Sequence, residues 1–434
     1  MGGQRLARDI RHTLVNRGEP GYEDVRAAVA GNAPTRPCHP DVIVRAAVAD
    51  DVAEAIALAR DRGMTVTVRA GGQDRWGAPA RDGGMLIDLS RLRRHSVEDG
   101  SATVQPGVTG RDLTRALAAR EHAFPVAHRG DVTLSGFLLG GGIGWNSRAW
   151  GPACAALEAI EAVTAAGETI RCSERENADL LWAARGAGPG FFAAVTSFQL
   201  GLRHLPPAIM TTRHVFPLAD VEDVGGWADQ VAAAVPANVE LSVALTTAGR
   251  GERVVVVTAT AFSCAWDDAI RCLEPLRDCP VAARALIRQV DQPTPFAVLF
   301  SGSDALWPAR RRTAADSLWL DEGFGTLLAG LARHAEGAPS PESVVLAALA
   351  PGGPVHAPAP GMAFAPLGRL RLDCYAMWVD RAADEANLTW LRDLVAAAGR
   401  SPARGSFTPA TGERLQALRA RYDPGGLFAG DPRP

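Results

Sequence analysis

Two glycine-rich segments constrain this 434-residue chain more than any other feature. The first, 68–77 (VRAGGQDRWG), follows a short β-branched run that is typical of a buried strand. The second, 133–151 (TLSGFLLGGGIGWNSRAWG), concentrates glycines around 136–144. A strand that runs into Gly-Gly presents backbone N–H groups that can approach a phosphate closely. Each segment alone is also compatible with an ordinary turn, but the pair in this order predicts a bound cofactor.

In this order and spacing, the two segments resemble the FAD-binding domain of the vanillyl-alcohol-oxidase superfamily, and most of all its berberine-bridge-enzyme-like branch. Further similarity lies in 18–24 (GEPGYED), in 179–202 (DLLWAARGAGPGFFAAVTSFQLGL) and in 421–428 (RYDPGGLF). The resemblance therefore covers most of 18–205 and the C-terminal tail. It implies the PCMH-type FAD-binding fold with FAD as the cofactor.

The resemblance also implies which residues bind FAD. The segment after the first strand would hold the pyrophosphate through its backbone, and the second segment would lie along the flavin. The implied cofactor-binding residues are Arg69, Ala70, Gly71, Gly72, Gln73, Asp74, Gly130, Thr133, Leu134, Gly136, Gly140, Gly141, Gly142, Gly144, Val195 and Phe428.

Two positions depart from the family pattern of covalent flavin attachment. Relatives commonly have His where this chain has Gln73, and many have Cys near Gly130. Neither Gln nor Gly can form those bonds, so we expect FAD to bind non-covalently. The resemblance also places Leu134 beside the oxygen-reactive edge of the flavin, which predicts slow reaction with oxygen. The alternative is that Leu134 is a core residue.

Candidate catalytic residues lie in 370–378 (LRLDCYAMW). Strand periodicity places Arg371, Asp373 and Tyr375 on one face, which the resemblance sets against the flavin ring. Arg371 would hold an anionic substrate group, and Asp373 or Tyr375 would act as base. The alternative is an ordinary Arg–Asp pair on a sheet face. His128, just before the second glycine segment, is a candidate for proton transfer or else a surface histidine.

The element pattern predicts an α+β protein of two domains. A β-α-β pattern over 41–68 opens the first domain, after a predicted amphipathic helix within 1–17. After Pro206-Pro207 the pattern changes to long strands with helices between them, which favours an antiparallel sheet with helices on one face. We expect an FAD-binding domain of 1–205 plus 405–434 and an inserted substrate-binding domain of 206–404. Its predicted strands are 210–216, 239–246, 252–262, 343–350 and 368–379, and its predicted helices are 219–233, 265–276, 304–334 and 382–398.

Composition excludes several other classes of protein. All 45 basic residues counted as Lys and Arg are Arg, which excludes a Schiff-base lysine and a Walker P-loop. The net charge of −3, without a basic block, gives no reason to expect nucleic acid. The seven cysteines form no CxxC pair, so no metal site is expected. The N-terminus lacks the apolar region of a secretory signal, and no run is suited to span a membrane, which together predict a cytoplasmic protein.

These observations predict a flavin-dependent oxidoreductase. A medium-sized organic substrate would give a hydride to FAD, and tailoring of natural products is the expected setting. The alternative is a redox-neutral cyclase or isomerase that keeps the flavin as a structural element or has lost it. A third possibility is a flavin-carrying electron-transfer subunit, but the presence of a full second domain argues against it. The predicted partner is a small-molecule substrate, and the sequence does not indicate its identity or an oligomeric state.

Overall fold

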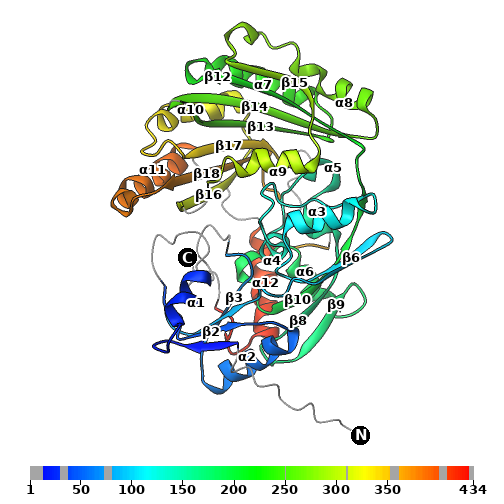
Figure 1. Ribbon diagram of the computed structural model, residues 1–434, viewed down its shortest axis with the longest axis vertical. Coiled ribbons are helices and arrows are strands. Elements are labelled where there is room, and N and C mark those ends of the chain that lie inside the picture. The colour runs from blue at the N-terminus through cyan, green and yellow to red at the C-terminus, as the bar shows by residue number, and fades with distance from the viewer. Residues whose placement is uncertain are drawn as a thin grey trace.

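The computed structural model describes residues 13–29, 38–72, 81–249, 251–308, 311–351, 361–399 and 408–429. They form two domains stacked along the long axis of the molecule (Figure 1). One domain holds the N-terminal half of the chain and the C-terminal tail, and the other is built from the residues between them. Among the described helices, none is both long and apolar enough to cross a membrane.

The first domain begins with a small mixed sheet in the order β1-β2-β4-β3. Its strands are β1 (Leu14–Asn16), β2 (Val42–Arg45), β4 (Met85–Asp88) and β3 (Val66–Arg69), accompanied by α1 (Tyr22–Val29) and α2 (Ala49–Asp61). β2 and β3 both run parallel to β4, as the β-α-β pattern predicts. A helix was predicted within 1–17. This prediction is wrong for Leu14–Asn16, which the structure describes as an antiparallel strand paired with β2.

A second, antiparallel sheet completes the first domain in the order β5-β6-β10-β8-β9. Its strands are β5 (His95–Glu98), β6 (Ser101–Val104), β10 (Ala194–Gly201), β8 (Leu157–Val163) and β9 (Thr169–Ser173). The helices are α3 (Gly110–Ala118), α4 (Leu134–Leu139), α5 (Ser147–Trp150) and α6 (Ala178–Ala184), and the short strands β7 (His122–Ala123) and β11 (Arg203–His204) pair with each other. The second glycine-rich segment thus contains α4 and α5.

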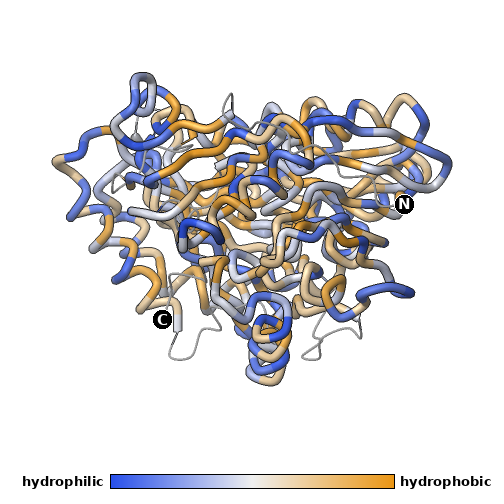
Figure 2. Tube along the Cα trace, turned by 90° about the horizontal axis from the view of Figure 1, so that it is seen from below, coloured by the Kyte–Doolittle hydropathy of each residue, from blue (hydrophilic) through white to orange (hydrophobic). Residues whose placement is uncertain are grey.

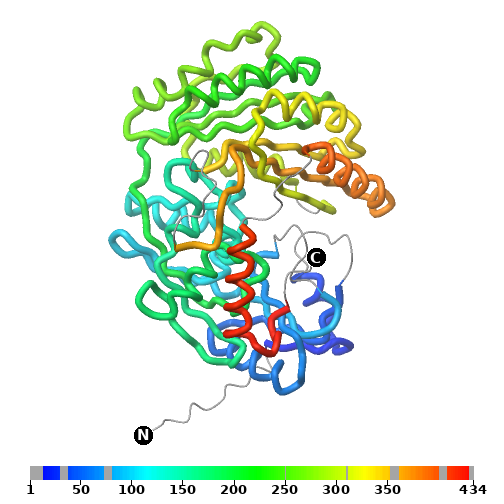
Figure 3. The backbone as a smooth tube through the Cα atoms, turned by 180° about the vertical axis from the view of Figure 1, so that it is seen from behind, coloured from blue at the N-terminus to red at the C-terminus, as the bar shows by residue number. Residues whose placement is uncertain are grey.

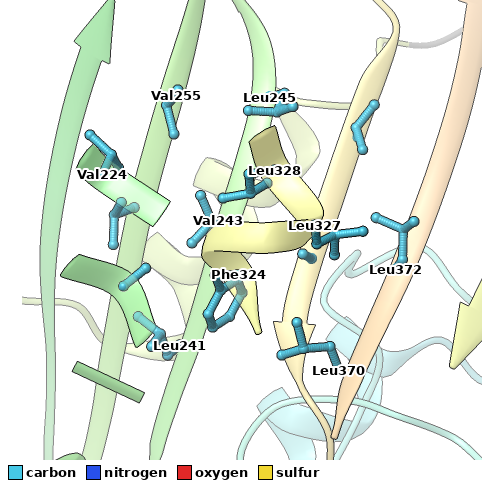
Figure 4. Packing of buried hydrophobic residues seen from close by; sticks show 14 of the residues in the cluster. Val224, Leu241, Val243, Leu245, Val255, Phe324, Leu327, Leu328, Leu370 and Leu372 are labelled. Carbon is cyan, nitrogen blue, oxygen red and sulfur yellow. The ribbon is translucent and has the colours of Figure 1, made fainter. Parts of the chain in front are cut away.

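The second domain is a seven-stranded antiparallel sheet in the order β15-β12-β14-β13-β17-β18-β16. The strands are β12 (Ala208–Pro217), β13 (Val239–Ala248), β14 (Glu252–Ser263), β15 (Ile287–Pro293), β16 (Arg312–Leu320), β17 (Val344–Leu349) and β18 (Leu370–Trp378). The helices α7 (Val221–Ala234), α8 (Trp266–Leu273), α10 (Phe324–Glu336) and α11 (Asp384–Ala397) share one core with one sheet face. Figure 4 shows Val224, Phe324 and Leu328 of these helices packed over Val243 and Leu372 of the sheet. The predicted antiparallel sheet with helices on one face is confirmed.

Two strands of this sheet differ from the sequence prediction. Residues 304–334 were expected to form one helix, and instead contain β16 followed by α10. β16 forms because it pairs with β18 along its whole length, from Arg312 opposite Trp378 to Leu320 opposite Leu370. β15 was not predicted either, and α9 (Phe296–Asp304) follows it on the side of the sheet that faces the first domain (Figure 1).

The C-terminal tail returns to the first domain, as Figure 3 shows from behind. Helix α12 (Pro409–Tyr422) packs beside α6, and the Arg414 guanidinium lies 3.8 Å from the centre of the Trp182 ring. Phe428 then forms a parallel bridge with Val66 of β3 and is 3% exposed. Hydrophobic segments gather in the interior, whereas the outer loops are largely hydrophilic (Figure 2). The tail is therefore a structural part of the first domain.

Candidate functional site

A cavity of about 930 Å³ lies between the two domains. The first domain contributes the end of β3, both ends of α4, the segment around Phe191 and the tail at Phe428. The second domain contributes the sheet face that its helices leave uncovered, together with α9. The cavity therefore has one glycine-rich wall and one wall made of strand side chains.

The end of β3 has the features of an anion-binding backbone. Arg69, Ala70, Gly71 and Gly72 all line the cavity. A β-carbon at Gly71 would lie 2.6 Å from Oγ1 of Thr133, which also lines the cavity, and Gly72 has φ +64°, in the left-handed region. Both positions therefore need glycine for this backbone path.

Arg69 adds a buried positive charge to this wall. Its Nη1 lies 3.6 Å from Oδ1 of Asp88, and both side chains are almost fully buried. Burial lowers the pKa of Arg69, and the Asp88 charge opposes that shift. The Nε of Arg69 has no hydrogen-bond partner within the described part of the chain. A buried donor of this kind suits an anionic ligand group.

The glycines of the second segment divide into two groups. Gly136, Gly140 and Gly142 line the cavity, and a β-carbon at Gly136 would meet no atom of the described residues within 4 Å. Gly141 and Gly144 are absent from the described lining and serve packing. A β-carbon would lie 2.1 Å from the Phe364 ring at Gly141, and 2.1 Å from a backbone carbonyl oxygen at Gly144.

Two further predicted cofactor residues lie away from the described cavity wall. Leu134 is 1% exposed and belongs to the core of the first domain with Val108 and Leu138. Gly130 is covered by Arg111, whose guanidinium Nη2 would lie 2.6 Å from a β-carbon there. Val195 and Phe428 do line the cavity, whereas Gln73 and Asp74 lie outside the described residues. The side chain of Leu134 is therefore packed in the core, as the alternative interpretation expects, and it is not part of the described cavity lining.

The glycine-rich wall fits a flavin dinucleotide. It combines a left-handed glycine at a strand end, open space at Gly136 and the Nε of buried Arg69, which has no hydrogen-bond partner among the described residues. The cavity volume lies toward the upper end of the range of roughly 300–1,000 Å³ that is usual for ligand sites. Backbone N–H groups at the end of β3 would hold the phosphates, and the residues around Gly136 would accept a flat ring.

The opposite wall brings together the three residues predicted on β18. Arg371, Asp373 and Tyr375 line the cavity, whereas the alternate residues Leu370, Leu372, Cys374 and Ala376 belong to the helix-covered core. Nε and Nη2 of Arg371 each donate to Oδ1 of Asp373 at 3.1 Å. Ser317 donates a short hydrogen bond to the same oxygen. Tyr375 is 3% exposed and packs edge-on against Trp307, with ring centres 5.2 Å apart.

His128 lies on the cavity wall with a partner that the sequence did not reveal. Its Nε2 is 3.3 Å from Oε2 of Glu240 on β13, and its ring packs edge-on against Trp145 with centres 4.3 Å apart. The alternation of Glu240 with Ser242 along β13 was the available signal, because both side chains line the cavity. Glu240 and His128 lie far apart in the sequence, so only the three-dimensional fold shows that their side chains are in contact.

The described residues hold no group of three or more His, Cys, Asp and Glu side chains suited to a metal ion. The cavity instead offers backbone donors, arginine guanidiniums, carboxylates and a tyrosine. These groups suit binding of an anionic cofactor on one wall and orientation of an organic molecule on the other.

Comparison with known proteins places the chain in a family. Residues 40–173 match the family model described as an FAD binding domain. The FAD-linked oxidoreductase janO of Penicillium janthinellum is 34% identical over 287 residues, which are 65% of this chain and 64% of janO. The FAD-linked oxidoreductase ptmO of Penicillium ochrochloron is 32% identical over 312 residues, which are 71% of this chain and 69% of ptmO. The match with janO therefore spans somewhat less than two thirds of that relative.

Solved structures show the same fold at lower sequence identity. The structure of 6-hydroxy-D-nicotine oxidase from Arthrobacter nicotinovorans has a TM-score of 0.84 at 21% identity, covering 98% of each chain. The BBE-like 1 protein of Physcomitrella patens has a TM-score of 0.83 at 17% identity, covering 96% of this chain and 95% of its own. The predicted berberine-bridge-enzyme-like fold is confirmed, and the chain belongs to the family of FAD-linked oxidoreductases.

Proposed function

We propose that this protein oxidises a medium-sized organic molecule held between non-covalently bound FAD and the open sheet face of the second domain. The observation that carries the proposal is a cavity between the domains that has two chemically different walls. One wall is glycine-rich and suited to the cofactor, and the other presents Arg371, Asp373 and Tyr375. FAD, when bound, would supply the redox chemistry by accepting a hydride.

The second-domain wall would orient the substrate and remove its proton. Asp373 accepts hydrogen bonds from Arg371 and Ser317, which fix its carboxylate on the sheet face. We therefore assign orientation to Arg371 and Asp373, and proton removal to Tyr375, whose ring is held by Trp307. Domain bounds of 1–205 plus 405–434 and 206–404 are part of the same proposal, as is the natural-product setting.

Non-covalent binding rests on Gln73 and Gly130. Gln73 lacks a nucleophilic nitrogen, and the α-carbon of Gly130 is covered by Arg111. Acid precipitation of the yellow protein should leave FAD in the supernatant and a colourless pellet. A yellow pellet would reveal an attachment residue elsewhere, while leaving the oxidation itself in place.

The oxidation is tested by mixing the FAD-loaded protein anaerobically with a panel of alcohols and amines. A substrate should bleach the flavin absorption and yield a product that has lost two hydrogens. Turnover of a compound without bleaching and without change of its oxidation level would contradict the proposal. That outcome is the one expected of a redox-neutral cyclase or isomerase.

A further inference from the structure

One arginine on the cavity wall differs from the others in its interactions. Arg213 lies in the middle of β12, and its side chain lines the cavity. Its chain neighbours Thr212 and His214 are fully buried, so Arg213 occupies the open face of the sheet. The side chain is half-buried.

Other arginines of the cavity wall have hydrogen-bond or ion-pair partners, and Arg148 donates to the backbone carbonyls of Pro236 and Val239. Arg69 lies beside Asp88, Arg311 forms a pair with Glu342, and Arg371 forms a pair with Asp373. Arg213 makes no ion pair or hydrogen bond with any residue that the structure describes. A half-buried guanidinium without a counter-charge on a cavity wall suits an incoming anion, which can supply both the charge and the hydrogen-bond acceptors.

The surroundings of Arg213 are neutral and polar. The strand register sets Gln289 on one side of it and Thr258 on the other, with Ser242 one strand further. All three line the cavity and carry hydrogen-bonding side chains without charge. They can complete the coordination of an anionic group, but they cannot neutralise Arg213.

The same row of the sheet continues to Arg371. It passes from Arg213 through Thr258, Ser242 and Ala348, so that four strand spacings separate the two arginines. At about 4.8 Å per spacing, the two α-carbons are roughly 19 Å apart. The next row of the cavity wall carries Val256 and Leu346, which offer apolar surface between the two charged ends.

We propose that Arg213 binds a carboxylate of the substrate, remote from the end of the sheet that holds Arg371. The substrate class is then an organic acid with an apolar body. This inference rests on the proposed function and names the substrate class of the same cavity. Binding of an anion to Arg213 does not require reduction of the flavin, so carboxylate affinity can be measured separately from substrate oxidation.

The test uses the FAD-loaded protein with 4-phenylbutyrate, its primary amide and inorganic phosphate as probes. Affinities are measured by titration of the flavin absorption spectrum and by thermal shift. Wild type should bind 4-phenylbutyrate more tightly than the amide. Arg213→Gln should weaken carboxylate binding about tenfold or more, because the charge-assisted hydrogen bonds to the carboxylate are lost, while leaving amide binding unchanged. Arg213→Lys should restore part of the loss.

Arg288→Gln is the matched control, because Arg288 is exposed on the neighbouring strand β15 and is absent from the cavity lining. Equal carboxylate affinity in Arg213→Gln and Arg288→Gln would overturn the assignment. So would failure of wild type to prefer the carboxylate over the amide, or a preference for phosphate. Flavin bleaching by a substrate without any dependence on Arg213 would remove this inference and keep the proposed oxidation. A protein that binds no FAD would remove the proposed function instead.

Discussion

His128 Nε2 and Glu240 Oε2 lie 3.3 Å apart, and their contact joins the two domains across the cavity. His128 precedes the second glycine-rich segment, whereas Glu240 belongs to the central sheet of the inserted domain. The His128 side chain is 42% exposed, so water screens the interaction. The pair therefore positions two walls relative to each other rather than stabilising the fold strongly.

This relationship is tested by a double-mutant cycle with His128→Asn and Glu240→Gln. The coupling free energy from urea unfolding should be about 0.2–1 kcal/mol, as for other exposed pairs. A coupling free energy of several kcal/mol would contradict this expectation, because it would show that water does not screen the contact.

The open space at Gly136 gives a prediction in which stability and cofactor affinity change in opposite directions. Gly136→Ala should stabilise the FAD-free protein by about 0.5–1 kcal/mol, because Ala favours α4 over Gly. The added methyl group would enter the cavity and weaken FAD binding. Gly226→Ala in α7 is the control, since an added β-carbon there would also have no atom within 4 Å in the described part of the chain, and Gly226 does not line the cavity. The two variants should gain similar stability, and unchanged FAD affinity in Gly136→Ala would contradict the placement of the cofactor.

Tyr375 is expected to be the proton acceptor during oxidation. Tyr375→Phe should slow anaerobic flavin bleaching by about 10²–10⁴-fold while leaving FAD binding intact, because the ring keeps its packing against Trp307. Tyr422→Phe serves as control, since the Tyr422 hydroxyl donates to Asp179 at 2.8 Å in the first domain. If Asp373→Asn slows bleaching and Tyr375→Phe does not, the base is Asp373.

The buried position of Leu134 predicts that its replacement affects stability rather than the reaction with oxygen. Because the side chain is buried in the core with Leu138, Leu134→Ala should destabilise the protein by about 2–5 kcal/mol. The reaction of the photoreduced enzyme with oxygen should stay at the wild-type rate. Stopped-flow reoxidation measures the rate, and marked acceleration in the variant would restore the original expectation of an oxygen gate.

His214 should make stability depend on pH. It is fully buried on β12 between a stacked Phe216 and an edge-on Trp227. Burial lowers the pKa of His214 below its ordinary 6.5, and the positive charge of Arg288 lowers it further. The unfolded chain therefore binds the proton first, so stability should fall as pH drops from about 6.5 to the lowered pKa, by about 1.4 kcal/mol for each unit between them. Urea unfolding of His214→Phe should show less of this acid loss, and an identical pH profile would exclude His214 as its source.

The backbone of the glycine-rich cavity wall was largely predictable from sequence, because it depends on neighbouring residues in the chain. Gly71 and Gly72 follow a strand directly, and the backbone that they permit is set within a few residues. The alternation on β18 likewise follows from strand periodicity, and Arg371, Asp373 and Tyr375 share one face as predicted. Which glycines serve packing was not predictable, since Gly141 contacts Phe364 from a remote part of the chain.

The second wall depended on pairings between distant strands. The stretch at 304–334 is rich in Ala, Leu and Arg, which favour helix, so its pattern concealed β16. Pairing with β18 overrode that preference. Glu240 and Arg213 reach the cavity only because β13 and β12 occupy particular places in the sheet order. Sequence periodicity predicts which face of the sheet such a residue occupies, but it does not predict which residues of other strands lie beside it.

The bridge between Val66 and Phe428 has a consequence for biosynthesis. Val66 N–H donates to the Leu427 carbonyl at 2.7 Å, and Ala429 N–H donates to the Val66 carbonyl at 2.9 Å. Phe428 fills the same hydrophobic core as the first strands of the chain. While the ribosome is still making the inserted domain, the nascent first domain therefore lacks part of its own core. Domains generally mature in the order of their translation, but here the domain that begins first can complete its core only after Phe428, which follows the whole inserted domain, has been added.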